Sequence, residues 1–544
     1  MKHWLTFLLT FSLLHFPLLH SFSSSLPRGI VMVDVSRHFM PLSFLYRQVD
    51  ELARYGIPAL HLHLTDAAGW RMEIRKYPEL TDQGAWRTAP LWQDWWNDGQ
   101  RRYADKATGY GGYYTQDELR HLVRYAAGLG VSIIPEIEFP GHSEEVTAAL
   151  PWLSCTGEAY TSADFCIGSD STYMFMEDVL REVCDIFPSP FIHLGGDEAG
   201  GNHWKTCPRC RGMKQSDAML RLNAIVRRLG RTMICWDEVF TGGLRDTSVA
   251  IMVWRSPDTA REALSSGHQV IYCPARYCYL DKYQDAPFTQ PRAMGGYLPL
   301  DSLYCHLISE DVPPASLALC LWTEYVPTEE DAERMLWPRA LALAEALKSK
   351  PRSSKAFRRW AERETRKLRA RGVHAFDLEH ETGQRTAYTS RARHLARGAR
   401  VTYKTPFHSL YPAAGAASLT DGWQGGWANT DGRWQGFLGA MDLTIDLAKP
   451  KRLRSIDMTF LQSRGVEIYL PSRFTVSVSN DLQTWTPLTD QPHASDPRPD
   501  ILHTFRWQSS GHGTSLLGLV RYIRIEARPD ASGGWLFVDE VVVH

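Results

Sequence analysis

Short runs of hydrophobic residues alternate with amphipathic stretches through much of the chain. The apolar runs have the length of strands that are buried on both faces of a parallel sheet. Between them, apolar residues recur at the three- and four-residue spacing of helices that cover such a sheet. Strands are predicted at residues 30–35, 59–65, 132–138, 191–194, 232–236, 249–254, 269–273 and 317–322. Helices are predicted at residues 41–55, 115–129, 172–187, 213–229, 258–266 and 331–347.

This alternation predicts an α/β fold, a parallel (β/α)8 TIM barrel, over residues 27–350. Beyond it, residues 351–400 form a helix and a connector; the helix, at 355–371, is strongly basic and amphipathic. Within residues 401–544, apolar and polar positions alternate one by one between turn residues. This pattern predicts a small, cysteine-free all-β sandwich. Its strands are expected at residues 443–447, 455–460, 474–479, 520–525 and 538–544.

The N-terminal residues 1–25 are predicted to be a signal peptide. Lys2 supplies the positive start, residues 5–19 are mostly apolar, and small residues at 21–23 offer a cleavage point. The protein is therefore expected to be secreted or periplasmic. His15 and Pro17 interrupt the apolar run, so a stable membrane span is not expected, although an uncleaved anchor is the alternative.

Charge and aromatic content narrow the class of partner. Lys plus Arg number 60 and Asp plus Glu number 61, so the chain has no large net charge that would attract nucleic acid. The basic helix is better explained as a helix with one solvent-exposed, charged face. The chain has 19 Trp, 22 Tyr and 21 Phe. Tryptophan-rich clefts suit the apolar faces of sugar rings, whereas the plainer interpretation is that these rings fill the core.

All ten cysteines fall within residues 155–320. In an exported protein Cys155 could pair with Cys166, or Cys207 with Cys210. Cys207 and Cys210 also have metal-like spacing, but no second Cys/His pair lies at zinc-finger spacing. Buried free thiols are expected at Cys235, Cys273 and Cys320.

Residues 191–198, Phe-Ile-His-Leu-Gly-Gly-Asp-Glu, carry the main catalytic signal. A buried strand runs into two glycines and then into adjacent carboxylates, Asp197 and Glu198. Two adjacent carboxylates repel each other when both are ionised, so one should hold its proton more tightly, as a general acid must near neutral pH. The alternative is a solvated Asp-Glu pair at a strand end.

Other polar and aromatic residues stand at or just beyond the ends of the predicted strands. In a parallel barrel these ends form a single rim, where catalytic groups gather. The residues at this rim are Arg37, Asp66, Glu136, Glu138, His142, Asp197, Glu198, Trp236, Asp237, Glu238, Trp254 and Glu324.

These stretches resemble glycoside hydrolase family 20, the β-N-acetylhexosaminidases. The resemblance covers residues 27–347, and its motifs occur in the family's order. The matching stretches are residues 34–39, 61–66, 69–71, 135–142, 191–198, 236–238, 279–281 and 321–324.

The resemblance implies a retaining mechanism in which the 2-acetamido oxygen of the substrate is the nucleophile. By resemblance, Asp197 holds the acetamido N–H and stabilises an oxazolinium-like intermediate, and Glu198 is the general acid and base. Tyr279 is expected to hydrogen-bond the acetamido oxygen. Asp66 and His142 are expected to orient and tune Glu198. No metal or cofactor is implied at this site.

The resemblance also implies the sugar-binding residues. Arg37, Asp281 and Glu324 are expected to bind hydroxyl groups, although Arg37 could form an ordinary salt bridge instead. Trp236, Trp254 and Trp322 are expected to wall the pocket, with core packing as the alternative. Glu136 and Glu138 are expected to support the residues that touch the sugar.

The C-terminal residues 401–544 resemble a discoidin-like, coagulation-factor type C module. Residues 419–422, 434–437 and 445–447 carry the match. Such modules often bind carbohydrate, sometimes with a structural calcium near an Asp-Gly loop such as residues 421–422. A purely structural sandwich packed against the barrel is the alternative.

The sequence therefore predicts an exo-acting β-N-acetylhexosaminidase whose partner is a glycan with a terminal β-linked N-acetylhexosamine. Two alternatives stay open: a family variant that releases a disaccharide, and a non-catalytic glycan-binding barrel.

Overall fold

The computed structural model describes residues 25–313, 315–509 and 518–544. Except for Ser25, the predicted signal peptide lies outside these residues. Within them, no helix combines the length and the apolar character that crossing a membrane requires.

Parallel strands close into a barrel in the order β1-β10-β9-β8-β7-β6-β5-β2, which confirms the predicted fold. Each strand is almost entirely buried, because its outer face lies under helices and its inner face fills the barrel interior. The strands are β1 (Gly29–Asp34), β2 (Ala59–His63), β5 (Ser132–Glu136), β6 (Phe191–His193), β7 (Thr232–Trp236), β8 (Ala250–Val253), β9 (Val270–Tyr272) and β10 (Ser316–Leu321).

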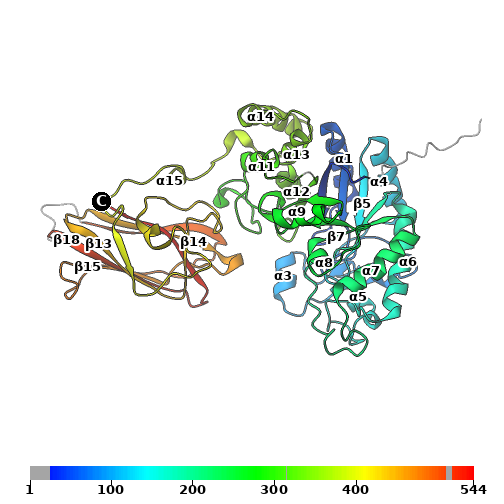
Figure 1. Cartoon of the computed structure of the whole chain (residues 1–544), viewed down its shortest axis with the longest axis horizontal. Coiled ribbons are helices and arrows are strands. Elements are labelled where there is room, and N and C mark those ends of the chain that lie inside the picture. Colours follow the sequence, from blue (N-terminus) through cyan, green and yellow to red (C-terminus); the bar gives the residue numbers. More distant parts are fainter. Residues whose placement is uncertain (1–24, 314, 510–517) are drawn as a thin grey trace, which may run out of the picture.

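Amphipathic helices surround these strands (Figure 1). In α1, for example, Phe44, Leu45, Val49 and Leu52 form one buried stripe. The helices are α1 (Leu42–Tyr55), α4 (Gln116–Gly128), α6 (Asp170–Ile186), α7 (Gln215–Arg228), α9 (Pro257–Ser265), α12 (Glu329–Leu336) and α13 (Ala340–Ala346).

The single helix predicted at residues 331–347 is wrong. The structure has two helices there, α12 and α13, separated around Pro338. Proline has no backbone N–H, and it disfavours helical backbone in the residue before it. Trp337 accordingly has extended torsion angles, φ −108° and ψ 132°.

Loops between the main elements carry shorter ones, and β3 pairs with β4 outside the barrel. These elements are α2 (Glu79–Asp82), β3 (Trp86–Arg87), α3 (Trp92–Asn97), β4 (Tyr110–Gly111), α5 (Glu144–Ala149), η1 (Pro151–Leu153), α8 (Asp237–Thr241), α10 (Ala275–Cys278), η2 (Pro287–Thr289) and α11 (Leu300–Leu307).

The predicted basic helix is α14 (Ser354–Ala370), which buries Phe357, Ala361 and Leu368. Several of its basic side chains form ion pairs; Arg358, for example, lies 2.6 Å from Glu381. The connector that follows contains η3 (Leu378–His380) and α15 (Thr386–Thr389).

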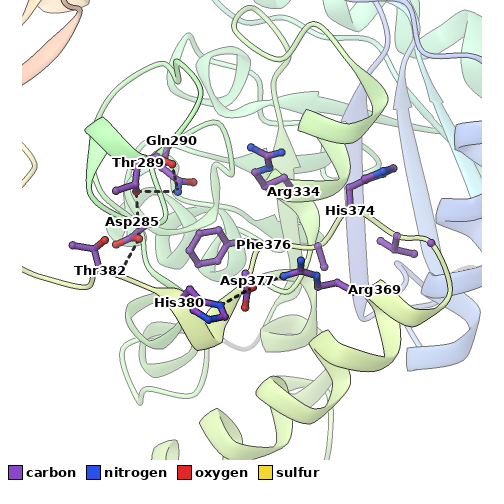
Figure 2. A pocket seen from close by; sticks show the side chains of 13 residues that line it. Asp285, Thr289, Gln290, Arg334, Arg369, His374, Phe376, Asp377, His380 and Thr382 are labelled. Carbon is purple, nitrogen blue, oxygen red and sulfur yellow. Dashed lines mark hydrogen bonds and ion pairs between the residues drawn. The ribbon is translucent and has the colours of Figure 1, made fainter.

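A hollow of about 460 Å³ lies where this connector meets the barrel loops (Figure 2). Several charged groups in it are already engaged: Arg369 pairs with Asp377 at 2.6 Å, and Asp285 accepts hydrogen bonds from the backbone of Thr382 and Gly383. None of the predicted site residues lines it. The hollow therefore belongs to the junction rather than to the barrel rim.

The C-terminal module is a sandwich of two antiparallel sheets, as predicted (Figure 1). One sheet consists of β11 (Arg400–Tyr403), β13 (Met441–Lys451), β18 (Val520–Arg528), β15 (Arg473–Ser479) and β16 (Thr486–Pro492). The other consists of β12 (Gln435–Leu438), β19 (Trp535–Val543), β14 (Ser455–Ser463) and β17 (Asp500–Gln508). The short helices η4 (Gly415–Thr420) and η5 (Arg464–Val466) lie in its loops.

The sandwich contacts loops of the barrel domain directly. The Tyr283 hydroxyl donates a hydrogen bond of 2.8 Å to Asp500 Oδ2 in β17. Beside it, the rings of Phe288 and Trp427 meet edge to face with centroids 5.7 Å apart. The two modules therefore share a small mixed interface.

All ten cysteines are free in the structure, and Cys235, Cys273 and Cys320 are buried thiols as predicted. Neither suggested disulfide, Cys155 with Cys166 or Cys207 with Cys210, is present. These four cysteines instead gather into one cluster, whose sulfur atoms lie within 4.8 Å of one another.

Candidate active site

The strand ends of the barrel bring the predicted site residues to one rim. Arg37 follows β1, Asp66 follows β2 and His142 follows β5. The others stand at or after β6 to β10: Asp197 and Glu198, Trp236, Trp254, Tyr279 and Asp281, and Trp322 and Glu324. Because the strands are parallel, groups distant in sequence become neighbours.

Two glycines set the backbone in front of the carboxylate pair. Gly195 and Gly196 have φ angles of +57° and +96°, a region that L side chains rarely adopt. A Cβ at Gly195 would overlap the carboxylate of Glu138, and one at Gly196 would overlap Val239. The glycines therefore make room for the protein's own side chains.

Asp197 and Glu198 lie in different environments although they are adjacent. The Asp197 side chain is 14% exposed and the Glu198 side chain is 64% exposed. His142 Nε2 lies 3.6 Å from an oxygen of each carboxylate. Glu198 and His142 also have left-handed backbone, with φ of +45° and +51°, which is uncommon outside glycine and often marks functional positions.

These environments separate the two pKa values. Burial raises the pKa of Asp197 above its usual value, against the opposing charge of His142. The contact with His142 lowers the pKa of Glu198. Asp197 is therefore the residue of the pair that holds its proton more tightly. A general-acid role for Glu198 would instead lead one to expect a raised pKa at Glu198.

His142 belongs to a chain of charged groups that leads into the barrel. Its Nδ1 lies 3.4 Å from Asp66 Oδ1, and Asp66 Oδ2 lies 2.7 Å from the Arg37 guanidinium. Burial disfavours the imidazolium, but Asp66 and Asp197 outweigh burial and raise the pKa of His142 well above its usual range. The His142 imidazole therefore faces both carboxylates of the pair, and its raised pKa favours the protonated form.

Glu136 anchors a buried network beneath this chain. Its Oε2 lies 2.7 Å from His63 Nδ1 and 3.0 Å from His61 Nε2, and its Oε1 accepts a 3.0 Å hydrogen bond from the Trp236 indole and lies 2.8 Å from His193 Nδ1. Burial opposes the charge of His63, yet Glu136 and Asp66 raise its pKa to about 10. Both oxygens of Glu136 are engaged, so this network positions Trp236 and Asp66.

Aromatic rings form a wall along the same rim. Trp254 and Tyr279 stack with centroids 6.1 Å apart, and Trp322 lies 5.9 Å from both Tyr279 and Trp236. The Trp254 indole donates to Glu238, whose pKa burial raises to about 8. These rings offer apolar faces beside the carboxylate pair.

Three buried carboxylate oxygens point to a polar ligand. Asp197 Oδ1, Asp281 Oδ1 and Glu324 Oε2 have no hydrogen-bond partner within the described residues. Buried polar atoms in proteins are normally paired, so unpaired ones at a rim suit the hydroxyl and amide groups of a substrate. Burial raises the pKa of Glu324 to about 7, against the charge of Arg37 3.8 Å away.

Comparison with known proteins agrees with this geometry. Residues 28–351 match the glycosyl hydrolase family 20 catalytic domain. The chain belongs to glycosyl hydrolase family 20. Residues 402–541 match the F5/8 type C domain, which agrees with the predicted discoidin-like module.

Several relatives of this family 20 chain carry the name β-hexosaminidase. The protein from Porphyromonas gingivalis is 36% identical over 341 residues, covering 58% of this chain and 42% of its own. The protein from Vibrio furnissii is 32% identical, covering 58% of this chain and 56% of its own. The chain thus spans about half the length of these relatives.

A solved family 20 structure has a similar fold. The exo-β-N-acetylglucosaminidase from Vibrio harveyi, in complex with N-acetylglucosamine, superposes with a TM-score of 0.55. It is 27% identical, with 64% of this chain and 58% of that chain covered.

Some residues of this family 20 site were not assigned roles from sequence. Asp34 accepts hydrogen bonds from the backbone N–H groups of Arg37 and Thr323 and so ties β1 to β10. Among the histidines, His61 and His63 alternate in β2, and that two-residue period is the signal that places both inside the barrel.

Proposed function

We propose that the chain is an exo-acting β-N-acetylhexosaminidase that removes terminal β-linked N-acetylglucosamine or N-acetylgalactosamine from glycans. The observation that carries this proposal is the carboxylate pair: a covered Asp197 and an open Glu198, both 3.6 Å from His142. A glycan-binding site needs no such division between an acid and an amide-holding group.

In the first step the sugar's acetamido oxygen attacks the anomeric carbon, and the glycosidic C–O bond breaks. Glu198 gives its proton to the departing oxygen. Asp197 accepts a hydrogen bond from the acetamido N–H through its unpaired Oδ1, and stabilises the positive oxazolinium. Tyr279 donates to the acetamido oxygen; burial raises the pKa of Tyr279 well above its usual value, so its hydroxyl keeps its proton.

In the second step Glu198 takes a proton from water, and the water oxygen bonds to the anomeric carbon as the oxazolinium ring opens. Each step displaces a group at the anomeric carbon and inverts its configuration. Because two inversions cancel, the product retains the β configuration, as in substrate-assisted family members.

Substrate binding would reconcile the lowered pKa of Glu198 in the free protein with its role as a general acid. Its side chain is 64% exposed without a sugar, and a sugar at the rim would exclude water from it. Desolvation raises the pKa of a carboxyl group. The acid form would therefore be favoured in the complex, where it is needed.

The remaining polar groups suit the hydroxyls of a terminal sugar. Arg37 and Glu324 lie together, and Glu324 Oε2 and Asp281 Oδ1 have no hydrogen-bond partner in the described part of the chain. The tryptophan wall would cover the apolar ring face and the acetamido methyl group.

Two proposals concern the whole chain. The N-terminal apolar residues support a secreted or periplasmic location, and the match to the F5/8 type C domain supports carbohydrate contact by the C-terminal module. Carbohydrate contact by the C-terminal module would be tested by glycan array binding of a variant in which Asp197 and Glu198 are replaced.

Hydrolysis of aryl N-acetyl-β-glucosaminides tests the function. We expect turnover by the wild-type chain. Glu198→Gln should abolish activity on substrates with poor leaving groups and spare much of it on activated aryl glycosides, because good leaving groups need no proton. Absence of wild-type turnover would contradict the enzymatic proposal, and equal losses on both substrate types would contradict the acid role of Glu198.

A further inference from the structure

Four cysteines come together from the two loops that follow β5 and β6. Cys155 and Cys166 lie in the loop after β5, and Cys207 and Cys210 in the loop after β6. The Sγ atoms of Cys155 and Cys166 lie 3.6 and 3.5 Å from Cys210 Sγ, and Cys166 Sγ lies 3.9 Å from Cys207 Sγ. Three of the four are buried.

These separations are those of ligands around one metal ion. Zinc–sulfur bonds of about 2.3 Å in a tetrahedron place neighbouring sulfurs about 3.8 Å apart. A disulfide would require about 2.05 Å. Cys210 is equally close to Cys155 and Cys166, whereas a disulfide joins a sulfur to a single partner.

The backbone donates a hydrogen bond to one of the sulfurs and turns tightly beside it. Gly168 N–H lies 3.3 Å from Cys210 Sγ. A Cβ at Gly168 would overlap the Arg209 carbonyl oxygen, so this approach requires glycine. The backbone of residues 207–210 forms a tight turn, with Cys210 N–H donating to the Cys207 carbonyl at 3.1 Å. Amide donors of this kind stabilise the charge that metal-bound thiolates carry.

A cationic side chain also lies at the cluster. The Arg209 guanidinium donates to the backbone carbonyls of Ser154 and Cys155, each at 3.4 Å. The thiolate is the form that binds metal. A nearby guanidinium offsets part of the net negative charge of a four-thiolate zinc centre.

We propose that Cys155, Cys166, Cys207 and Cys210 bind one structural Zn²⁺. Four sulfur ligands in a closed tetrahedron are typical of a structural zinc site, which leaves no open position for substrate. The site therefore has no direct part in the proposed glycosidase chemistry, and its test does not depend on that function.

The zinc would fasten the two loops that carry the catalytic groups. The first loop bonds to the His142 segment, since Phe165 N–H donates to Pro140 at 2.9 Å and Ser143 N–H to Ala163 at 3.1 Å. It also bonds to the loop of Glu198, since Asp164 accepts from Gly201 N–H at 2.9 Å. Loss of zinc should thus disturb the relation between His142 and Glu198.

Metal analysis of the purified wild-type chain is the first test. We expect about one zinc per chain. Replacement by Co²⁺ should give the intense visible and near-ultraviolet absorption of tetrahedral cobalt–thiolate coordination. Removal of the metal with a chelator should lower the melting temperature, and Zn²⁺ but not Mg²⁺ should restore it.

A matched pair of variants locates the site. Cys207→Ser combined with Cys210→Ser should lose the zinc, whereas Cys305→Ser, at an exposed cysteine outside the cluster, should keep it. The native mass of the wild-type chain distinguishes zinc from disulfides. A mass that shows no metal and the loss of the four thiol hydrogens would overturn the proposal in favour of two disulfides. Bound iron, or a wild-type chain that takes up neither Zn²⁺ nor Co²⁺, would overturn it as well.

Discussion

Among single residues, the different environments of two adjacent carboxylates shift their pKa values in opposite directions. Asp197 is covered and its pKa is raised by burial, while Glu198 is open and its pKa is lowered by His142. The sequence places the two acids side by side. It could not say which of them holds its proton, because that depends on groups that come from β2 and β5.

Replacement of His142 by a neutral residue tests this coupling. The imidazolium stabilises the Glu198 carboxylate, so His142→Asn should raise the Glu198 pKa in the free enzyme. Protonated Glu198 would then persist to higher pH, and the alkaline limb of the pH profile of kcat/KM, which reports the free enzyme, should shift upward. A shift to lower pH, or none, would contradict the assigned coupling.

The sequence alone could not predict that the four cysteines form one cluster. Zinc-finger spacing requires each pair of ligands to be close in sequence, and only Cys207 and Cys210 are. Cys155 is 55 residues from its neighbour Cys210, and only the barrel topology brings them together.

At the scale of elements, apolar runs predicted the barrel strands well because strands buried on both faces read as continuous hydrophobic segments. The same reasoning missed four strands of the sandwich. β11, β16 and β17 consist mostly of exposed or half-buried residues and so lack a clear apolar period, and β12 has only four residues. The reasoning also joined α12 and α13 by counting apolar positions across Pro338.

The turn after β6 offers an element-scale prediction. Gly195→Ala should cost about 1 kcal/mol or more, because φ is +57°. It should also reduce kcat strongly, because the new Cβ would overlap Glu138 and displace the carboxylate pair.

Gly230→Ala is the matched control, since its φ is +73° and a Cβ there would meet no atom of the described residues within 4 Å. It should cost about 1 kcal/mol in the free energy of unfolding from its backbone conformation alone, and leave kcat unchanged. Equal kcat values for the two variants would show that the Gly195 turn does not position the catalytic pair.

At the scale of the whole molecule, one buried contact couples the two modules. Tyr283 is 2% exposed, and its hydroxyl donates to Asp500 in the sandwich. A double-mutant cycle of Tyr283→Phe and Asp500→Asn should give a coupling energy of about 1 kcal/mol in the free energy of unfolding. Additive effects would mean that the hydrogen bond does not hold the modules together.

Fluorination of the substrate's N-acetyl group tests whether the substrate supplies the nucleophile. Fluorine withdraws electrons from the amide oxygen and weakens it as a nucleophile. Across aryl glycosides with zero to three fluorines on the acetyl group, we expect kcat/KM to fall steeply with each fluorine. Rates that are insensitive to fluorination would mean that a protein group attacks the sugar, and would contradict substrate-assisted catalysis.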